Sequence, residues 1–422
     1  MNMQSPPLEP SRRAFSYKGF RFFWLATLLT NFGVQIMAVS LGWQIYDATH
    51  QPILLGLVGL SLFLPGLILV LLTGLVADRF NRRLIMTCCL GVEFLGAVFL
   101  LFYAHEQVKE VRPIFALLVI LGTARAFLAP ASSSLAPNLV PTAALSNAIT
   151  LNASAWQFAG ILGPVAGGLL YGLGPSVAFG VAAVLSLIAA VSALMIPKPV
   201  RREAHQASSL DTLTAGFRYI LGEKVVLGAI SLDLFAVLLG GAMALLPVYA
   251  RDILHAGPLA LGLLRGAPGI GAIVTAVAVA RFPVRDHAGK ILFGFVAGFG
   301  LFTAIFGLST SVWVAIPALA LAGACDMVSV TIRETIMQLW TPDAVRGRVS
   351  AVNSVFIGAS NELGEFRAGM AAAWLGAVPA VVLGGLGTLA VAVIWSWAFP
   401  GLRKQRALDR RMVAEPVAAA AK

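Results

Sequence analysis

One stretch decides the fold of this chain: Gly74-Leu75-Val76-Ala77-Asp78-Arg79-Phe80-Asn81-Arg82-Arg83. A long apolar run ends in this stretch, and another apolar run starts at Leu84. The stretch therefore predicts a tight charged turn between two hydrophobic helices. Gly74 lets a neighbouring helix approach closely, as small residues do in membrane interfaces, and Asp78 and Arg79 fall where the chain meets water. The simplest alternative is that the arginines only mark the cytoplasmic side of a membrane.

The composition places the chain in a membrane. The 422 residues are 59% hydrophobic and only 12% charged, whereas soluble domains carry about 25% charged residues. Such a chain cannot cover its surface with charge, so the surface faces lipid. The cysteines Cys88, Cys89 and Cys325 all lie in apolar runs and give no indication of the redox compartment.

The apolar runs predict an all-α membrane protein with twelve transmembrane helices in two six-helix bundles, because a spanning helix needs about 20 apolar residues. The expected spans are 20–46, 53–77, 84–104, 113–136, 144–172, 175–196, 225–250, 258–280, 290–309, 312–337, 349–374 and 377–399.

The basic residues predict the orientation of these spans. With the N-terminus in the cytoplasm, most of the 30 lysines and arginines fall in cytoplasmic segments, and only Lys109, Arg112 and Arg251 fall in the opposite loops. Cytoplasmic loops carry such an excess, so both termini are expected inside. Basic residues against an anionic membrane leaflet also explain the net charge of +11 without a nucleic-acid partner.

The chain divides into two halves around one polar linker. We expect a cytoplasmic leader (1–19), a first bundle (20–196), a linker (197–224), a second bundle (225–399) and a basic cytoplasmic tail (400–422). Within the linker, residues 211–221 predict an amphipathic interfacial helix. The leader has no cleavable signal pattern.

The two halves repeat each other. Residues 141–152 and 342–353 align without gaps, with Pro141 matching Pro342 and Asn152 matching Asn353, 201 positions apart. Parallel repeats of this kind occur in transporters built from two bundles. We expect Thr341 to cap the helix that follows it and Asp343 to favour that helix's positive end.

The sequence offers no enzyme chemistry. The five histidines fall in loops or at helix ends, and no His, Cys or carboxylate pair has metal-ligand spacing within one helix. There is also no G-x-x-x-x-G-K-[ST] nucleotide loop. We therefore expect neither a metal nor a cofactor, and a protein that is not an enzyme.

Charged residues inside the apolar runs are the candidates for proton coupling, since each is costly there unless it faces water or a partner. Asp233 and Asp326 appear as lone acids, and Arg125 lies 201 positions before Asp326, so the two occupy matching places in the two halves. The alternative to a role in proton coupling is that Arg125 is purely structural. Glu93 shows no partner in the sequence.

A second pair of acids lies in the eleventh span. Glu362 and Glu365 are three residues apart and share a helix face. The alternative to a role in proton coupling is that one of these two acids simply pairs with Arg367. In the first span, Asn31 and Gln35 face one way and are candidates for lining a substrate cavity. Trp43 and Tyr46 are expected to be interface anchors.

Small residues mark the fifth span, which holds the pattern G-x-x-G-P-x-x-G-G. Its glycines allow close helix contact, and its proline removes a backbone hydrogen bond and can bend the helix. Ordinary small-residue packing is the alternative to a functional motif. The pattern consists of Gly160, Gly163, Pro164, Gly167 and Gly168.

Three of these features resemble motifs of the major facilitator superfamily. The turn at residues 74–83 resembles motif A, which joins the second and third transmembrane helices. The fifth-span pattern resembles motif C, the antiporter signature of exporters, and Arg125 resembles the motif B arginine that is tied to proton coupling. The resemblance implies that motif A gates the cytoplasmic side, with Asp78 expected near Arg346 and Arg348. It also implies that the helices of Arg125 and Asp326 face a central cavity from opposite halves, so we expect these two charges to face each other across it.

Nearly the whole chain resembles the enterobactin-exporter-like branch of this superfamily, which includes macrolide-efflux-like proteins. The resemblance lies in residues 21–46, the motif A turn and residues 338–349. Members of the branch often have Gly-Asp in the first span, where this chain has Gly33 and Val34. The acid is missing, so Asp233 or Asp326 would have to carry the proton.

The resemblance implies a multi-pass transporter of the bacterial inner membrane, working as a monomer. We expect it to export a siderophore-like or drug-like small molecule in exchange for protons by alternating access. The alternatives are a proton-coupled uptake symporter and a membrane scaffold or sensor that transports nothing.

Overall fold

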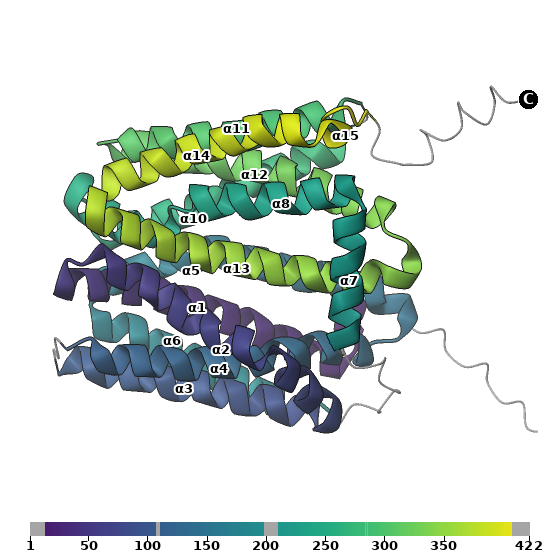
Figure 1. Cartoon of the computed structure of the whole chain (residues 1–422). Helices are drawn as coiled ribbons and strands as arrows, with labels where there is room; N and C mark the ends of the chain where they lie inside the picture. Colours follow the sequence, from purple (N-terminus) through teal and green to yellow (C-terminus); the bar gives the residue numbers. More distant parts are fainter. Residues whose placement is uncertain (1–12, 107–109, 198–209, 283, 285, 407–422) are drawn as a thin grey trace, which may run out of the picture. The chain divides into compact units, whose positions relative to one another are not determined.

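The computed structural model describes residues 13–106, 110–197, 210–282, 284 and 286–406, without the side chains of residues 71, 78, 210–215 and 344. All regular elements among these residues are helical (Figure 1). The long helices are α1 (Lys18–Thr49), α2 (Pro52–Arg79), α3 (Arg82–His105), α4 (Arg112–Leu135), α5 (Thr142–Leu173), α6 (Pro175–Leu194), α7 (Leu210–Gly222), α8 (Lys224–Gly240), α10 (Pro258–Arg281), α11 (Ala288–Leu308), α12 (Val312–Trp340), α13 (Asp343–Leu375) and α14 (Ala377–Ala398). The short elements are η1 (Ala14–Ser16), η2 (Ala136–Asn138), η3 (Met243–Leu245), α9 (Leu246–Val248), the π-helix η4 (Tyr249–Ile253) and α15 (Pro400–Arg403).

Every predicted span corresponds to helical structure. Eleven segments of the described chain are long and apolar enough to cross a membrane. The remaining helix, α13, has 33 residues, which gives a length of about 50 Å at 1.5 Å per residue. Charged residues along it, including Glu362, Glu365 and Arg367, lower its mean hydropathy. The twelve-helix prediction is consistent with this set.

The seventh predicted span, 225–250, is not one continuous helix. α8 ends at Gly240, and the chain continues through η3, α9 and η4. Arg367 of α13 donates hydrogen bonds to the carbonyl oxygens of Leu238 and Leu239 at 2.8 and 2.6 Å. The guanidinium thus bonds carbonyls that a helix end leaves without partners. The prediction of one continuous helix is wrong because Arg367, which binds the last carbonyl groups of α8, lies on another helix.

The repeated prolines lie directly before two helices. Pro141 precedes α5, and Pro342 is the residue before α13. Thr341 does not cap α13, contrary to expectation: it ends α12, is 2% exposed, and its hydroxyl has no hydrogen-bond partner among the described residues. Asp343 does lie in the first turn of α13, where it pairs with Arg346 at 2.5 Å.

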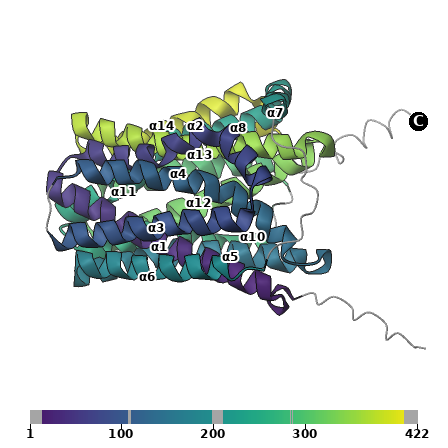
Figure 2. The same cartoon turned by 90° about the horizontal axis from the view of Figure 1, so that it is seen from below.

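The chain forms two compact units, each described by itself. The first comprises residues 1–38, 64–163 and 173–207, and the second comprises 39–63, 164–172 and 208–422. In the first unit, α3 and α6 run side by side (Figures 1 and 2). The core of this unit joins the start of α1 to α3, α4 and the end of α6 through Phe20, Phe23, Met86, Leu135 and Ala193.

The second unit packs α11 against α12 and α14, and α10 against α12. Its core includes Leu232 of α8, Leu292 of α11, Ile332 of α12 and Leu402 of α15. α7 crosses the ends of α8 and α13 (Figure 1), where Tyr219 donates a hydrogen bond to the carbonyl oxygen of Trp340 at 2.7 Å.

Candidate functional site

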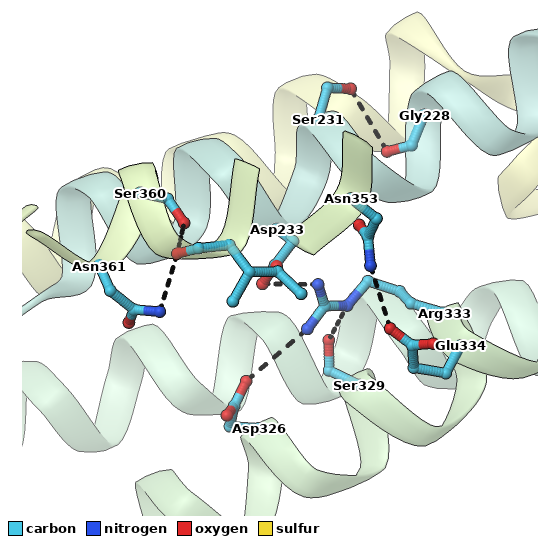
Figure 3. Close-up of polar contacts among 11 residues, drawn as sticks. Gly228, Ser231, Asp233, Asp326, Ser329, Arg333, Glu334, Asn353, Ser360 and Asn361 are labelled. Carbon is cyan, nitrogen blue, oxygen red and sulfur yellow. Dashed lines mark hydrogen bonds and ion pairs between the residues drawn. The ribbon is translucent and has the colours of Figure 1, made fainter. Parts of the chain in front are cut away.

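The charged centre of the second unit is Arg333 of α12 (Figure 3). Its Nη1 lies 2.5 Å from Asp233 Oδ1 on α8, and its Nη2 lies 3.9 Å from Asp326 Oδ1 on its own helix. Its Nε donates a hydrogen bond to Ser329 Oγ at 3.2 Å. The prediction that Asp233 and Asp326 are lone acids is therefore wrong, because both face the same guanidinium.

Helical spacing brings these groups together. Asp326, Ser329 and Arg333 are three and seven residues apart, which places them on one face of α12. Asp233 approaches from α8, and Asp233, Asp326 and Ser329 line a small cavity of about 10 Å³, roughly the space of one water molecule. We name Asp233, Asp326, Ser329 and Arg333 the Arg333 cluster.

The cluster has two carboxylates for one guanidinium. The side chains of Asp233 and Arg333 are each 10% exposed, and 46% of the Asp326 side chain is exposed. Asp233 therefore forms the close, buried pair, while Asp326 lies farther from the guanidinium and has the more exposed side chain. If both carboxylates are ionised, the cluster carries one surplus negative charge, which a single proton can neutralise.

The first unit has its own buried ion pair. Arg125 of α4 binds Glu93 of α3 in a bidentate manner, with Nε to Oε1 at 2.6 Å and Nη2 to Oε2 at 3.2 Å. The Glu93 side chain is 2% exposed and that of Arg125 is 29% exposed. Glu93 thus has a partner that the sequence did not reveal. Arg125 and Asp326, expected to compensate each other, each have a partner of opposite charge inside their own unit.

The acids of α13 face a glycine of α2. A Cβ built on Gly59 would lie 3.4 Å from Glu365 Oε2 and closer still to Glu362 Oε2. Both carboxylates therefore point to the same place, and only glycine leaves room for them there. Arg367 pairs with neither in the described structure, since its donors bind the α8 carbonyl oxygens.

The motif A turn binds helix ends. Asn81 caps α3 by accepting a hydrogen bond from the backbone N–H of Arg83 at 3.1 Å. Arg82 donates to the carbonyl oxygens of Ala77 and Ser134 at 3.3 and 3.4 Å, near the ends of α2 and α4. Arg83 also donates to the carbonyl oxygen of Leu194, at the end of α6. The arginines therefore gather the C-terminal ends of three helices of the first unit.

The remaining motif A residues are less constrained. Gly74 is half-buried in α2, and Arg79 is exposed at its end. The Asp78 side chain lies outside the described residues, so its expected approach to Arg346 and Arg348 stays a prediction. Arg346 donates to the carbonyl oxygens of Gln338 and Thr341, at the end of α12.

The glycine-rich pattern of α5 makes two close helix contacts. In the first unit, a Cβ on Gly163 would lie 2.7 Å from Gln35 Cβ, and Gly160 also faces the Gln35 side chain. In the second unit, a Cβ on Gly168 would lie 3.1 Å from the Cα of Gly262 and closer to the carbonyl oxygen of Pro258 on α10. Pro164 and Gly167 are buried between these contacts.

The polar residues of α1 have local roles in the structure. Gln35 is packed against α5 at the glycines just described. Asn31 Nδ2 donates a hydrogen bond to the carbonyl oxygen of Thr27 one turn earlier, at 2.8 Å. Both are only half-buried, and their role in a substrate cavity stays a prediction.

Sequence reasoning missed a polar group where α1 meets η4 within the second unit. Asp47 pairs with Arg251 at 2.6 Å, and the Tyr46 hydroxyl donates a hydrogen bond to Asp252 Oδ2. Tyr46 is 4% exposed, so its assignment as an interface anchor is wrong. The sequence contains a signal for this contact. Asp47 and the pair Arg251–Asp252 carry opposite charges just beyond the ends of two predicted spans, both on the side predicted to face away from the cytoplasm. We name these four residues the α1–η4 latch.

Comparison with known proteins supplies the context for these groups. A family model described as "Transmembrane secretion effector" matches residues 10–420. The enterobactin exporter EntS of Escherichia coli (strain SMS-3-5 / SECEC) is 25% identical over 422 residues, with 98% of this chain and 99% of that protein covered. The enterobactin exporter EntS of Shigella boydii serotype 4 (strain Sb227) is 26% identical over 397 residues, with coverage of 92% and 90%.

Solved structures share the arrangement of helices. A bacterial homologue of the human lysosomal transporter Spinster, in an inward-facing and unoccupied conformation, aligns with a TM-score of 0.69 at 15% identity, covering 95% of this chain and 97% of that one. A bacterial homologue of the iron transporter ferroportin, in an inward-facing state, aligns with a TM-score of 0.67 at 15% identity, covering 92% and 99%. Likeness at this identity shows a common fold.

Proposed function

Since this chain belongs to the transmembrane secretion effector family of major facilitator transporters, we propose that it exports a siderophore-class small molecule in exchange for protons. It is a multi-pass membrane protein of an inner-membrane transporter family. The cargo class is taken from the relatives, which are named enterobactin exporters and match over nearly their whole length. The proposed orientation, with both termini cytoplasmic, rests on the distribution of lysine and arginine.

The observation that carries the proposal is the charge balance of the Arg333 cluster. Two carboxylates share one guanidinium, and the outer one, Asp326, is 3.9 Å from it and 46% exposed. A group that carries protons must be reached by water and must change its interactions when it titrates. Asp326 is the more exposed and the more distant of the two acids, which supports it as the proton carrier, whereas Asp233 lies 2.5 Å from Arg333 and is 10% exposed.

The cycle follows from this balance. A proton that binds Asp326 removes the surplus negative charge and leaves a neutral Asp233–Arg333 pair. Loss of that proton on the other side of the membrane restores the negative charge beside Arg333. Cargo crosses the membrane in the opposite direction between these two steps. One conformation of the transporter therefore accepts protons, and the other accepts cargo.

Alternating access requires contacts that open and close. The α1–η4 latch is suited to this role because its ion pair is partly exposed, with side chains of Asp47 and Arg251 that are 52% and 29% exposed. Such pairs contribute only about 0.2–1 kcal/mol, so they break readily. The π-helix that carries Arg251 and Asp252 is a form often found at functional sites. Motif A gates the cytoplasmic side, with Asp78 as the acid of that gate.

The direction of transport is tested in the organism that makes the siderophore. Deletion of the gene is expected to leave the iron-free siderophore inside the cell and to lower its amount in the medium, with recovery when the native chain is supplied again. Mass spectrometry of cell extract and medium measures both pools. Reduced uptake of a solute without siderophore retention would identify a symporter, and no change in either pool would indicate a scaffold or sensor.

A further inference from the structure

The last described residues of the chain fold back onto the start of α11 in the second unit. The first two backbone N–H groups of α11, those of Ala288 and Gly289, donate hydrogen bonds to the carbonyl oxygens of Arg406 and Gln405 at 3.2 and 3.0 Å. Gly289 leaves no room for a side chain, because a Cβ there would lie 2.7 Å from the carbonyl oxygen of Arg403. The chain's own carbonyl groups therefore occupy the positive end of α11.

This fold-back places four basic residues at one corner of the unit, where α15 contacts α8, α11 and α14 (Figure 1). Three of the four are exposed, and Arg403 is half-buried. None of them forms an ion pair or a side-chain hydrogen bond with a described residue. The acid that precedes α11, Asp286, pairs with His287 at 2.9 Å. We name the four residues the α11–α15 corner: Lys290, Arg403, Lys404 and Arg406.

Neighbouring elements do not balance the charge of this corner. α8 meets α15 where a Cβ built on Gly401 would lie 3.7 Å from Val225 Cγ2, and the first charged residues there, Glu223 and Lys224, are of opposite sign. Arg281, at the end of α10, adds one more exposed cation. The corner and its described neighbours therefore carry a surplus of positive charge.

The first unit uses its cations differently at the equivalent place. α3 and α11 are the third helices of the two predicted bundles, and each follows a short turn. At α3, Arg82 and Arg83 bind carbonyl oxygens at the ends of α2, α4 and α6. At α11, backbone hydrogen bonds hold the chain end instead. The basic side chains of the α11–α15 corner are therefore available to bind something outside the protein.

The corner lies where three candidate membrane spans meet water. α10 ends at Arg281, α11 begins at Ala288 and α14 ends at Ala398. Trp397 is 74% exposed in the last turn of α14, and tryptophan is enriched where membrane proteins meet lipid headgroups. Basic residues directly beyond it lie at the depth of the phosphate groups, where basic sites between helices bind anionic headgroups.

We propose that the α11–α15 corner binds the headgroup of an anionic phospholipid. Hydrogen bonds from lysine and arginine to phosphate are charge-assisted and therefore strong, and the bound anion offsets the repulsion among four like charges. The occupant is a lipid and not a soluble anion, because Trp397 and Phe282, each 74% exposed at the ends of α14 and α10, offer apolar surface to acyl chains.

Binding is measured by native mass spectrometry of the full-length protein, titrated with one lipid at a time in detergent. The probes are dioleoyl phosphatidylglycerol, which is anionic, and dioleoyl phosphatidylcholine, which has the same chains and a phosphate but no net charge. Phosphatidylglycerol is expected to bind at least about fivefold tighter, because each basic residue near an anionic headgroup contributes a factor of about this size. Equal affinities would overturn the proposal. Displacement of phosphatidylglycerol by soluble glycerol phosphate would also overturn it and indicate a site for free phosphate.

Charge variants locate the binding. Lys404→Gln is expected to weaken phosphatidylglycerol binding about fivefold and to leave phosphatidylcholine binding unchanged, whereas Lys404→Arg should keep the native preference. Adding Arg406→Gln to Lys404→Gln should weaken binding further. The matched control is Arg218→Gln, which removes an exposed arginine of α7 and should bind as the native chain does. Equal weakening by Arg218→Gln would show a general attraction to basic surface and would remove the corner as the site.

A glycine variant separates the arrangement of the cations from their number. Gly289→Ala pushes the chain end away from α11 but keeps every charge, so its preference for phosphatidylglycerol should fall about fivefold. Gly294→Ala is the control, because a Cβ at Gly294 meets no atom within 4 Å among the described residues. Thermal unfolding shows whether each variant is folded, and the glutamine variants decide the test if Gly289→Ala is not. A folded Gly289→Ala with the native preference would contradict the proposal, since the number of charges alone would then explain the binding.

Discussion

At the scale of single residues, each unit contains a close ion pair between charged side chains of its helices. Glu93 and Arg125 form a bidentate pair, and Asp233 and Arg333 form a close pair. An isolated charge would be costly at these positions, and a pair removes most of that cost. Asp326 has a weaker ion pair than these acids, because it shares a guanidinium that Asp233 already binds.

Breaking one half of the Glu93–Arg125 pair should destabilise the protein more than removing both halves. Glu93→Ala leaves Arg125 without its bidentate partner and is expected to cost about 3 kcal/mol of unfolding free energy, while Glu93→Ala with Arg125→Ala should recover most of that loss. Thermal unfolding of the detergent-solubilised variants measures both effects.

The exposed residue Asp286, which pairs only with His287 among the described side chains, provides the control for that comparison. Asp286→Ala should leave the unfolding temperature unchanged. A double variant as unstable as the sum of the two single variants would show that the two side chains act independently.

The sequence identified the charges that interrupt apolar runs but not what they contact. Arg125, Asp233 and Asp326 stand out because they interrupt apolar runs. Their partners lie on other helices or two turns along the same helix: Glu93 is 32 residues from Arg125, and Arg333 is seven residues from Asp326. Hydropathy predicts that a helix forms and roughly where it begins and ends. Which side chains meet depends on the rotation of one helix against another.

At the scale of elements, arginines bind the C-terminal ends of helices. Arg82 and Arg83 serve α2, α4 and α6, Arg346 serves α12, and Arg367 serves α8. The last carbonyl groups of a helix have no intrahelical donors and carry partial negative charge, so a guanidinium satisfies both needs. This gives the motif A arginines a structural role beside the gating role proposed for the turn. It also explains how α8 ends inside a predicted span.

Close contact between α5 and α10 should depend on one glycine and not on its neighbour one turn later. Gly168→Val places a side chain against the backbone of Pro258 and Gly262 and is expected to lower both thermal stability and transport. Gly172→Val is the matched control, because a Cβ at Gly172 meets no atom within 4 Å among the described residues. Similar behaviour of the two variants in thermal unfolding and export assays would show that the close contact is dispensable.

At the scale of the whole molecule, the contact units do not follow the expected halves. α1, α2 and α5 each contribute residues to both units. The sequence predicts two six-helix bundles, 20–196 and 225–399, and this division stays a prediction. The repeat reports which segments are related, whereas the contacts of residues 39–63 and 164–172 with the second unit depend on glycines and on the α1–η4 latch.

The latch should hold the end of α1 to η4. Asp47→Arg places like charges together and is expected to raise amide hydrogen exchange in residues 249–253 by up to about fivefold, the effect of about 1 kcal/mol. Asp47→Arg combined with Arg251→Asp restores opposite charges and should restore slow exchange. The exposed pair Glu110–Arg112, at 3.8 Å, is the control for a charge swap, and persistent fast exchange in the swapped latch would remove it as a contact that holds the conformation.

The central claim is that Asp326 carries the exchanged proton, and proton flux driven by cargo tests it most directly. Proteoliposomes that contain a pH-sensitive dye are loaded with the iron-free siderophore, and the rate of proton counterflow is measured for the native chain, Asp326→Asn and the control Asp286→Asn. The account predicts that the native chain and Asp286→Asn exchange protons for cargo, while Asp326→Asn stays folded and moves no protons with cargo. Undiminished proton counterflow in Asp326→Asn would contradict it.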